Sequence, residues 1–301
     1  MRRSLLRVLR PYSAYQQSVD SRVLDAIDDL ERRLREQERM QLGVVTEDLL
    51  EALGALRSRI ADIEDVAAGT RALPYMAPGS LEQFSDPSAG VVLGYRDGGG
   101  KNEAAYVGFE EAFRGSEDRV RERQRGFLEL LRDHTPVLDA GCGRGEFLDL
   151  LRENGVEYTG VDVDVGMVEH CRAKGHEGVE LKAANEYLER LPDGELGSIF
   201  CAQMIEHLPY DELRRLLRLS LEKLRPGGLL VAETVNPHAP HGLKTFWVDP
   251  THQHPVFPEV ALVLCKLAGF GSAYVFHPLG TGHVEDDRYR ESEYAVVARK
   301  A

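Results

Sequence analysis

The stretch Val137–Phe147, which reads VLDAGCGRGEF, decides the fold of this 301-residue chain. An apolar run leads into Asp139, and three glycines then alternate with other residues, at Gly141, Gly143 and Gly145. Leucines at helical spacing follow directly. Glycine permits tight turns and lets a ligand approach bare backbone. Such a turn between a strand and a helix therefore predicts a binding site for the polar part of a nucleotide-like cofactor.

The spacing of the glycines narrows the choice of cofactor. It is Gly-x-Gly-x-Gly, whereas dinucleotide-binding turns have Gly-x-Gly-x-x-Gly, and an acidic residue precedes the first glycine. A second apolar run ends at Asp162, about twenty residues further on, where a carboxylate can accept hydrogen bonds from both ribose hydroxyls. A generic Rossmann-type turn that binds another ligand is the alternative.

The two segments resemble the first two motifs of the class I S-adenosylmethionine (SAM) methyltransferases. Residues 196–208, LGSIFCAQMIEHL, resemble the fourth strand of that family, and residues 221–233, LEKLRPGGLLVAE, resemble its turn into the fifth strand. The four motifs occur in the order of the family, and the resemblance covers residues 133–300. It implies SAM as the cofactor and a Rossmann-like α/β fold, with a seven-stranded sheet whose last strand is antiparallel.

Apolar runs alternate with helical segments over the same part of the chain, which indicates a mostly parallel sheet with helices on both faces. A helix is expected from about residue 104 to residue 133. Strands are expected near residues 136–139, 158–162, 178–182, 197–202, 228–234, 272–277 and 292–299.

The composition excludes several classes of protein. A net charge of −13 argues against a general nucleic-acid binder, because such binding depends on clustered Lys and Arg. No apolar run is long enough to cross a bilayer. The four cysteines show no CxxC spacing and are expected to be reduced core residues of a cytoplasmic protein.

The chain is expected to have three parts: a helical, coiled-coil-like extension (1–70), a Pro/Gly-rich linker (71–104) and the methyltransferase domain (105–301). In the extension, two apolar series at heptad spacing are out of phase with each other. We slightly favour one long helix that forms a homo-oligomer or binds a partner protein; a hairpin, or helices folded back on the catalytic domain, are the alternatives. The series are Val23, Ile27, Leu30 and Leu34, then Leu49, Leu53, Leu56, Ile60 and Ile63.

The first ten residues, MRRSLLRVLR, combine four arginines with apolar residues. A short basic amphipathic helix of this kind can lie on an anionic membrane surface, which would place the protein at the inner face of the membrane. An ordinary frayed terminus explains the same residues equally well.

The resemblance implies which residues contact SAM. The glycine turn would lie along the methionine part and Asp162 would hold the ribose. One position departs from the family, because Ala183 stands where many members have an Asp that binds the adenine amino group. Backbone at Ala184 or the side chain of Asn185 is expected to substitute for that hydrogen bond, which is typically worth about 1 kcal/mol. The expected cofactor residues are Asp139, Gly141, Cys142, Gly143, Asp162, Val163, Ala184, Asn185, Cys201, Ala202 and Gln203.

The acceptor side is expected in a histidine-rich region. Residues 106–116, 236–241 and 246–255 resemble bacterial methyltransferases of surface-polysaccharide (O-antigen type) biosynthesis, which carry an FRGS helix, an ETxNP strand end and a DPTHxxP loop. The resemblance implies methyl transfer to a carbohydrate oxygen, either a hydroxyl or a terminal phosphate. The alternatives are a small lipid or quinone acceptor and, in another class, a catalytically silent SAM-fold module that serves assembly.

Histidine can serve as a base near neutral pH, which makes the histidines of these loops the first candidates for catalysis. His207 can instead orient its loop, and Asp249 can instead cap a turn. No metal is expected, because Glu233, Asp249, His252 and His254 match no firm ligand spacing. The catalytic candidates are His207, His252 and Asp249, and the substrate-binding candidates are Tyr106, Arg114, Asn236, His238 and His254.

Overall fold

The computed structural model describes residues 22–36, 45–71, 75–77, 80–95 and 112–301. The basic segment 1–10 and the substrate-binding candidate at position 106 lie outside these residues. The chain divides into two compact units, Met1–Gly69 and Thr70–Ala301. Within the described ranges, no helix combines the length and the apolar character that a membrane span requires.

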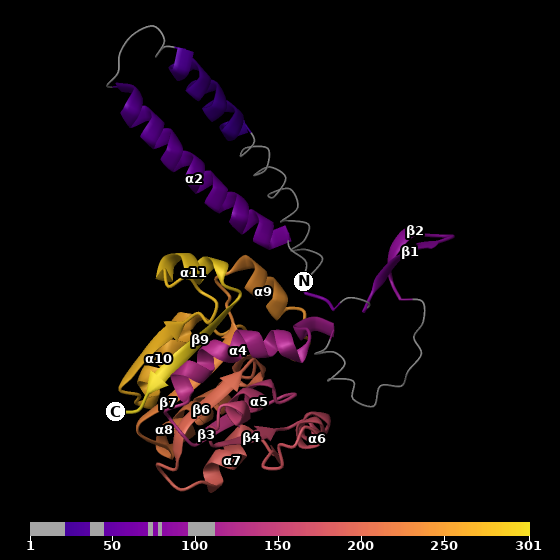
Figure 1. Cartoon of the computed structure of the whole chain (residues 1–301), viewed down its shortest axis with the longest axis vertical. Coiled ribbons are helices and arrows are strands. Elements are labelled where there is room, and N and C mark those ends of the chain that lie inside the picture. The colour runs from indigo at the N-terminus through magenta and orange to yellow at the C-terminus, as the bar shows by residue number, and fades with distance from the viewer. Residues whose placement is uncertain (1–21, 37–44, 72–74, 78–79, 96–111) are drawn as a thin grey trace. The chain divides into compact units, whose positions relative to one another are not determined.

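The first unit is a pair of antiparallel helices, residues 22–36 and α2 (Val45–Arg71) (Figure 1). Ile27 of the first helix packs against Leu53 and Ile60 of α2. Arg57 of α2 pairs with carboxylates of the first helix. The preference for one long helix is therefore wrong, and the hairpin alternative describes the chain.

Only four of the nine apolar positions in the two heptad series pack inside this hairpin. The other five repeat at intervals of seven residues, so on each helix they form a stripe along one side. These side chains are substantially exposed to solvent: Val23, Leu30, Leu49, Leu56 and Ile63.

The region predicted as a linker contains a β-hairpin, which its sequence does not predict. Strands β1 (Glu82–Asp86) and β2 (Gly90–Gly94) pair in antiparallel register. The Asp86 carboxylate accepts hydrogen bonds from the backbone N–H groups of Ser88 (2.8 Å) and Ala89 (3.0 Å), which closes the turn.

The second unit is built on a seven-stranded sheet in the order β5-β4-β3-β6-β7-β9-β8. The strands β3, β4, β5, β6 and β7 run parallel, and β9 is antiparallel to both of its neighbours, as the alternating pattern and the resemblance predict. The strands are β3 (Val137–Ala140), β4 (Tyr158–Asp162), β5 (Glu180–Leu181), β6 (Leu196–Ala202), β7 (Leu224–Val235), β8 (Ser272–Phe276) and β9 (Glu293–Arg299).

Helices cover both faces of the sheet (Figure 1). Leucines of α8 and apolar residues of α10 share one core cluster with the sheet, to which α7 also contributes. Apolar residues of α4 and α5 form a second cluster on the other face, and α6 packs beside α5. The helices of this unit are α4 (Glu117–Leu131), α5 (Glu146–Glu153), α6 (Val165–Ala173), α7 (Ala184–Arg190), α8 (Tyr210–Lys223), α9 (Pro240–Phe246), α10 (Pro258–Ala268) and α11 (Val284–Arg290).

The predicted helix over residues 104–133 is interrupted. Residues 112–114 are helical, but Gly115 has a φ of 93° and Ser116 is extended, so that α4 begins only at residue 117. A positive φ of this size favours glycine. The interruption changes the direction of the chain just after Arg114.

The topology places the functional loops together. Strands β3, β4, β6 and β7 all end at the same edge of the sheet, because they are parallel neighbours. The loops that follow them carry the glycine turn, Asp162, residues 203–207 and residues 236–241. In open α/β sheets this edge is the place where ligands bind.

Candidate active site

The glycine turn after β3 has the geometry that its sequence predicts. Gly141, Gly143 and Gly145 have φ values of 76°, 50° and 81°. A Cβ atom at Gly141 would lie 2.9 Å from Cγ of Met204, so this position is also confined by a side chain. The turn thus needs glycine for conformation and, at Gly141, for space as well.

The carboxylate of Asp162 holds this turn to the end of β4. It accepts a hydrogen bond from the backbone N–H of Gly143 at Oδ2 (2.9 Å) and another from that of Asp164 at Oδ1 (2.9 Å). Burial raises the pKa of Asp162, although these N–H groups act in the opposite direction. Each carboxylate oxygen has a further lone pair with which to accept a hydrogen bond from a ligand.

Carboxyl groups gather around the turn. Asp139 is only 2% exposed, and its pKa lies well above the usual value because of burial and because of the charges of Glu146 and Asp162. Glu146 is compensated by Arg144, whose Nε lies 2.7 Å from its Oε1. Burial and the repulsion of neighbouring carboxylates raise the pKa values of Asp139 and Asp162, and a cationic ligand would relieve this unfavourable ionisation, which suits a ligand with an ammonium and a sulfonium group. By this test the site fits SAM.

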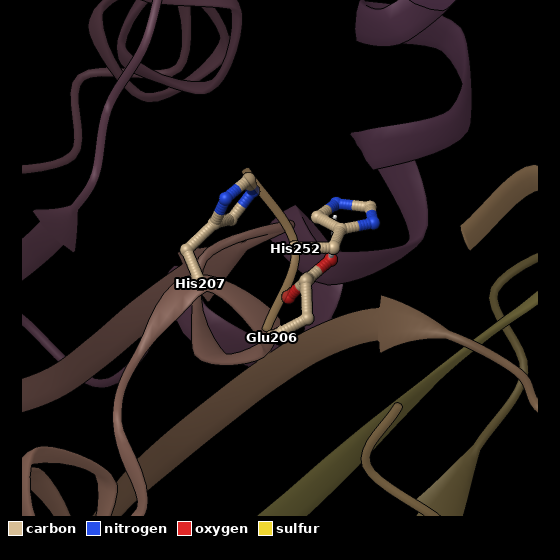
Figure 2. Close-up of side chains that lie close together, drawn as sticks. All are labelled: Glu206, His207 and His252. Carbon is tan, nitrogen blue, oxygen red and sulfur yellow. Dashed lines mark ion pairs between the residues drawn. The ribbon is translucent and has the colours of Figure 1, made fainter. Parts of the chain in front are cut away.

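A second set of polar side chains follows β6. The short helix η1 (Ile205–His207) carries Glu206 and His207, and the loop after α9 brings His252 against them (Figure 2). The imidazole rings of His207 and His252 have their centroids 4.5 Å apart, and Nε2 of His252 lies 4.0 Å from Oε1 of Glu206. We call Glu206, His207 and His252 the acceptor cluster.

The acceptor cluster adjoins the glycine turn. Met204, which lies between β6 and the cluster, is the residue that confines Gly141. Arg114 reaches the same place, where its Nη2 donates to the carbonyl of Gln203 (3.3 Å), and its positive charge lowers the pKa of Glu206. The segment that carries the cluster therefore lies close to the cofactor turn.

Comparison with known proteins agrees with this geometry. Residues 113–270, more than half of the chain, match the family described as "Methyltransferase domain". The chain belongs to the class I SAM-dependent methyltransferases. A SAM-dependent methyltransferase from Archaeoglobus fulgidus is similar in structure, with a TM-score of 0.59 and 32% identity over 65% of this chain and 99% of that one.

Curated relatives of the methyltransferase either have lower sequence identity than the Archaeoglobus fulgidus protein or align over a shorter part of the chain. A ubiquinone biosynthesis O-methyltransferase of Idiomarina loihiensis is 27% identical over 200 residues, which are 58% of this chain and 80% of that protein. A probable SAM-dependent methyltransferase of Mycobacterium tuberculosis is 37% identical over 134 residues, 44% of this chain. The chain spans 48% of that relative, and 58% of a similar one from Mycolicibacterium smegmatis.

Hydrogen bonds fix the protonation of both imidazoles of the methyltransferase. Nδ1 of His252 lies 2.7 Å from the carbonyl oxygen of Phe246, which only accepts, so Nδ1 carries the hydrogen. Nδ1 of His207 lies 2.9 Å from Oγ1 of Thr251, whose own hydrogen is directed to the Asp249 carboxylate (2.6 Å). In the neutral rings the lone pair of each histidine is consequently at Nε2.

Burial dominates the electrostatics of the cluster. It raises the pKa of Glu206 to about 7 and that of Glu233 to about 8. It lowers the pKa of His207 to about 4, with the neighbouring His252 as a further cause. The hydroxyl of Thr234 lies near Glu206 and opposes the rise in its pKa, but it does not meet the geometry of a hydrogen bond.

Other predicted residues have structural roles. The Asn185 amide nitrogen donates to the Glu212 carbonyl (3.1 Å) and to Glu212 Oε2 (2.7 Å), which fastens α7 to α8. The Cys201 thiol is fully buried in the core between β6 and the helices of one face. Both side chains thus have partners within the protein, and their contact with the cofactor stays a prediction.

Two polar side chains of the loop after β7 are hydrogen-bonded to neighbouring elements. Asn236 is completely buried, and its amide nitrogen donates to the carbonyls of Arg288 (2.9 Å) and Glu291 (2.8 Å), which ties the strand end to α11. Nε2 of His238 lies 2.9 Å from Oε2 of Glu259 on α10. These two candidates join other residues, and the structure does not bring them into the acceptor cluster.

The remaining candidate residues lie at the ends of strands, at the start of a helix or in the adjoining loops. Ala184 is the first residue of α7, and Val163 is largely exposed just after β4. Ala202 is half-buried at the end of β6. His254 is half-buried two residues beyond the histidine of the cluster. The thiol of Cys142 lies in a small core cluster beside α6.

Sequence reasoning missed Glu206 and Arg144. Glu206 stands next to a residue that was selected, and its importance comes from complete burial, which the sequence does not report. Arg144 is also buried, and its Nη1 donates to the carbonyl of Gly115 (3.1 Å), so it joins the glycine turn to the start of α4. The position of Arg144 between two glycines of the turn was the sequence feature that could have indicated its role.

Proposed function

We propose that this methyltransferase transfers a methyl group from SAM to a hydroxyl oxygen of a small apolar acceptor, of the phenolic lipid or quinone-precursor class. SAM supplies an electrophilic methyl group bound to a sulfonium. The observation that carries the proposal is the position of the acceptor cluster, which Met204 links directly to Gly141 of the cofactor turn. Oxygen-directed chemistry needs groups that handle a proton at this place, and the cluster offers a carboxyl and two imidazoles.

The chain's own residues divide the work. The glycine turn and Asp162 hold the cofactor in a fixed orientation, which supplies much of the acceleration in an in-line displacement. Arg114 donates a hydrogen bond to the Gln203 carbonyl just before the cluster, which holds its positive charge near the acceptor side. Nε2 of His252 and Nε2 of His207 present lone pairs to the acceptor oxygen.

The acceptor class rests on two supports. A relative that aligns over 80% of its own length is named a ubiquinone biosynthesis O-methyltransferase. The rim of the site is apolar as well, because Trp247 is 62% exposed and packs edge-on against Phe246, which stacks beside His252. Both favour a flat, apolar acceptor.

A carbohydrate oxygen, in a surface glycan, is the second candidate. The exposed Trp247 ring is compatible with it too, since an indole face can also pack against a sugar ring, and Arg114 provides a cation for a terminal phosphate, which a phenolic acceptor would not need. The resemblance of the DPTHxxP loop to glycan methyltransferases supports the same acceptor.

Labelled SAM separates the two acceptors. The full-length protein is incubated with methyl-labelled SAM and, in parallel, with the organic-extractable and the glycan fractions of a bacterial envelope. Label in the organic fraction that is stable to mild base supports the proposal, because an ether withstands such treatment and an ester does not. Label confined to the glycan fraction contradicts it and supports the second candidate.

We also propose that the helical hairpin serves self-association. Its exposed stripe of apolar side chains repeats every seven residues on both helices, as in helices that pack against a further pair. A catalytically silent assembly module would share this hairpin, and methyl transfer distinguishes the two. Contact of residues 1–10 with an anionic membrane remains a proposal from sequence alone.

A further inference from the structure

The acceptor cluster combines three side chains of the kinds that ligate transition metals. One ligand atom from each of Glu206, His207 and His252 can be chosen so that all three atoms lie within 4.8 Å of one another (Figure 2). We propose that the cluster binds one divalent transition-metal ion, which in turn holds the acceptor oxygen. The metal site stands on its own geometry, whereas its role at the acceptor rests on the proposed function.

Both imidazoles are prepared for a metal. The carbonyl of Phe246 fixes the hydrogen of His252 at Nδ1, and the Thr251 hydroxyl, itself directed to Asp249, does the same for His207. Each ring therefore presents the Nε2 lone pair. Metal-binding histidines are usually held in this way, by a hydrogen bond from the other ring nitrogen to a carbonyl or carboxylate group.

Glu206 lacks a partner that a cation would supply. Its side chain is completely buried, and in the described part of the chain neither carboxylate oxygen has a hydrogen-bond partner. A buried ionised carboxylate is costly unless it is paired or coordinates a metal. The unsatisfied carboxylate and the two lone pairs point to the same ligand, although His252 comes from a segment more than forty residues beyond η1.

The spacing is within reach of a metal centre after rearrangement of the side chains. Metal–ligand bonds of about 2.1 Å in a tetrahedral site place ligand atoms about 3.4 Å apart. Nε2 of His252 and Oε1 of Glu206 are 4.0 Å apart, and all three ligand atoms lie within 4.8 Å of one another, so that the ligands must move together by up to about 1.4 Å. Rotations of the side chains provide that movement.

The ligand set indicates the class of metal and leaves room for an acceptor. Two imidazoles and one carboxylate suit Zn²⁺, Fe²⁺, Co²⁺ or Mn²⁺, whereas Mg²⁺ and Ca²⁺ prefer oxygen alone. Three protein ligands with open positions are typical of catalytic rather than structural sites. Oδ2 of Asp249 lies 4.0 Å from Nε2 of His252, and its negative charge offsets the positive charge of Arg114 nearby.

The chemistry balances without an additional oxidant or reductant. When the metal is bound, the two imidazoles act as its ligands and not as bases, and a hydroxyl bound at the open position is polarised and releases its proton to water. A lone pair of that oxygen forms the new O–C bond while the S–C bond breaks, and the S–C electron pair stays on sulfur as a neutral thioether. The metal neither gains nor loses electrons.

Direct titration tests the site. The metal-stripped full-length protein is titrated with Co²⁺ alone and followed by visible absorption, and then with Zn²⁺ by calorimetry, in the absence of SAM and acceptor. We expect one ion per chain and a ligand-field spectrum with nitrogen donors. His252→Ala and Glu206→Gln should weaken binding at least about 10–100-fold, by comparison with the loss of supporting groups at known sites.

His238→Ala is the matched control, because His238 also pairs with a glutamate but lies outside the cluster. Circular dichroism verifies that each variant is folded, and His207→Gln replaces any variant that is not. Absence of saturable Co²⁺ binding in the wild type, or binding that His238→Ala abolishes and His252→Ala leaves intact, overturns the inference. Metal binding without methyl transfer to any fraction would support the metal site and reject the proposed function. Methyl transfer that resists a chelator, in a protein that binds no metal, would reject the metal site and support the proposed function.

Discussion

Replacement of Asp162 by alanine should weaken SAM binding strongly. In the structure the Asp162 carboxylate accepts hydrogen bonds from Gly143 and from Asp164, so it both fixes the glycine turn and retains lone pairs for the ribose hydroxyls. A hydrogen bond to a charged group contributes about 1.5–3 kcal/mol. Part of the loss is recovered by water in the variant, and we expect about 1–3 kcal/mol, or roughly a 5- to 150-fold rise in Kd.

Calorimetric titration with SAM or its demethylated product measures this change. Asp164→Ala is the matched control, because the Asp164 side chain caps α6 by accepting from the Met167 backbone N–H (3.0 Å). Loss of that cap should reduce stability by about 1 kcal/mol and leave Kd within about twofold of the wild-type value. An Asp162→Ala protein that is folded and binds SAM with unchanged Kd would refute the assignment of the cofactor site.

Further predictions concern stability and assembly. Gly145→Ala should cost about 1–3 kcal/mol in urea unfolding, because a Cβ would lie 2.9 Å from a cysteine sulfur at a φ of 81°. Gly155→Ala, at a φ of 66° in open space, should cost less, and equal costs would contradict the steric argument. Leu56→Asp should shift the full-length protein to a smaller mass in light scattering, whereas a wild-type monomer would reject self-association. Although burial raises the pKa of Asp149, hydrogen bonds from lysine and histidine lower it overall. The folded pKa therefore lies below the unfolded one. The ionised Asp149 therefore stabilises the fold above about pH 4, and this stabilisation is lost as the pH falls through the pKa of Asp149 in the folded protein. The urea midpoints of wild type and Asp149→Asn should consequently differ near neutral pH and converge in acid. A constant difference would contradict this sign.

The cofactor side of the site could be predicted from the sequence because short, continuous segments determine its geometry. The positive φ values of Gly141, Gly143 and Gly145 follow from alternate glycines after an apolar strand. Asp162 ends the next parallel strand, and parallel strands end at one edge. Topology therefore brings residues twenty positions apart together without any knowledge of side-chain packing.

The acceptor side was only partly accessible because it depends on contacts between distant loops. The sequence suggested His207 and His252 separately, but their pairing requires Thr251 to reach η1. Asn236 and His238 look like site residues in a histidine-rich loop, yet one binds carbonyl groups near α11 and the other a carboxylate on α10. Complete burial of a polar side chain has no signature in a single sequence.

The structure of the helical extension was also only partly predictable from the sequence, for the same reason. Two apolar series that are out of phase fit a long helix with a stutter and also fit a hairpin. The decision comes from contacts across the helices, such as Arg57 with carboxylates of residues 28 and 31, and Ile27 with Leu53. No periodicity within either helix encodes those pairs.

Transfer of labelled methyl groups by variants of the acceptor cluster tests the central claim most directly. Wild type, His252→Ala and His238→Ala are incubated with methyl-labelled SAM and the envelope fraction that accepts label, and the rate of ether formation is measured. We predict that His252→Ala lowers the rate by about 10²–10⁴-fold while SAM binding persists, and that His238→Ala stays near the wild-type rate. An undiminished rate with His252→Ala, or no label transferred to any fraction by the wild type, would contradict methyl transfer to oxygen at this cluster.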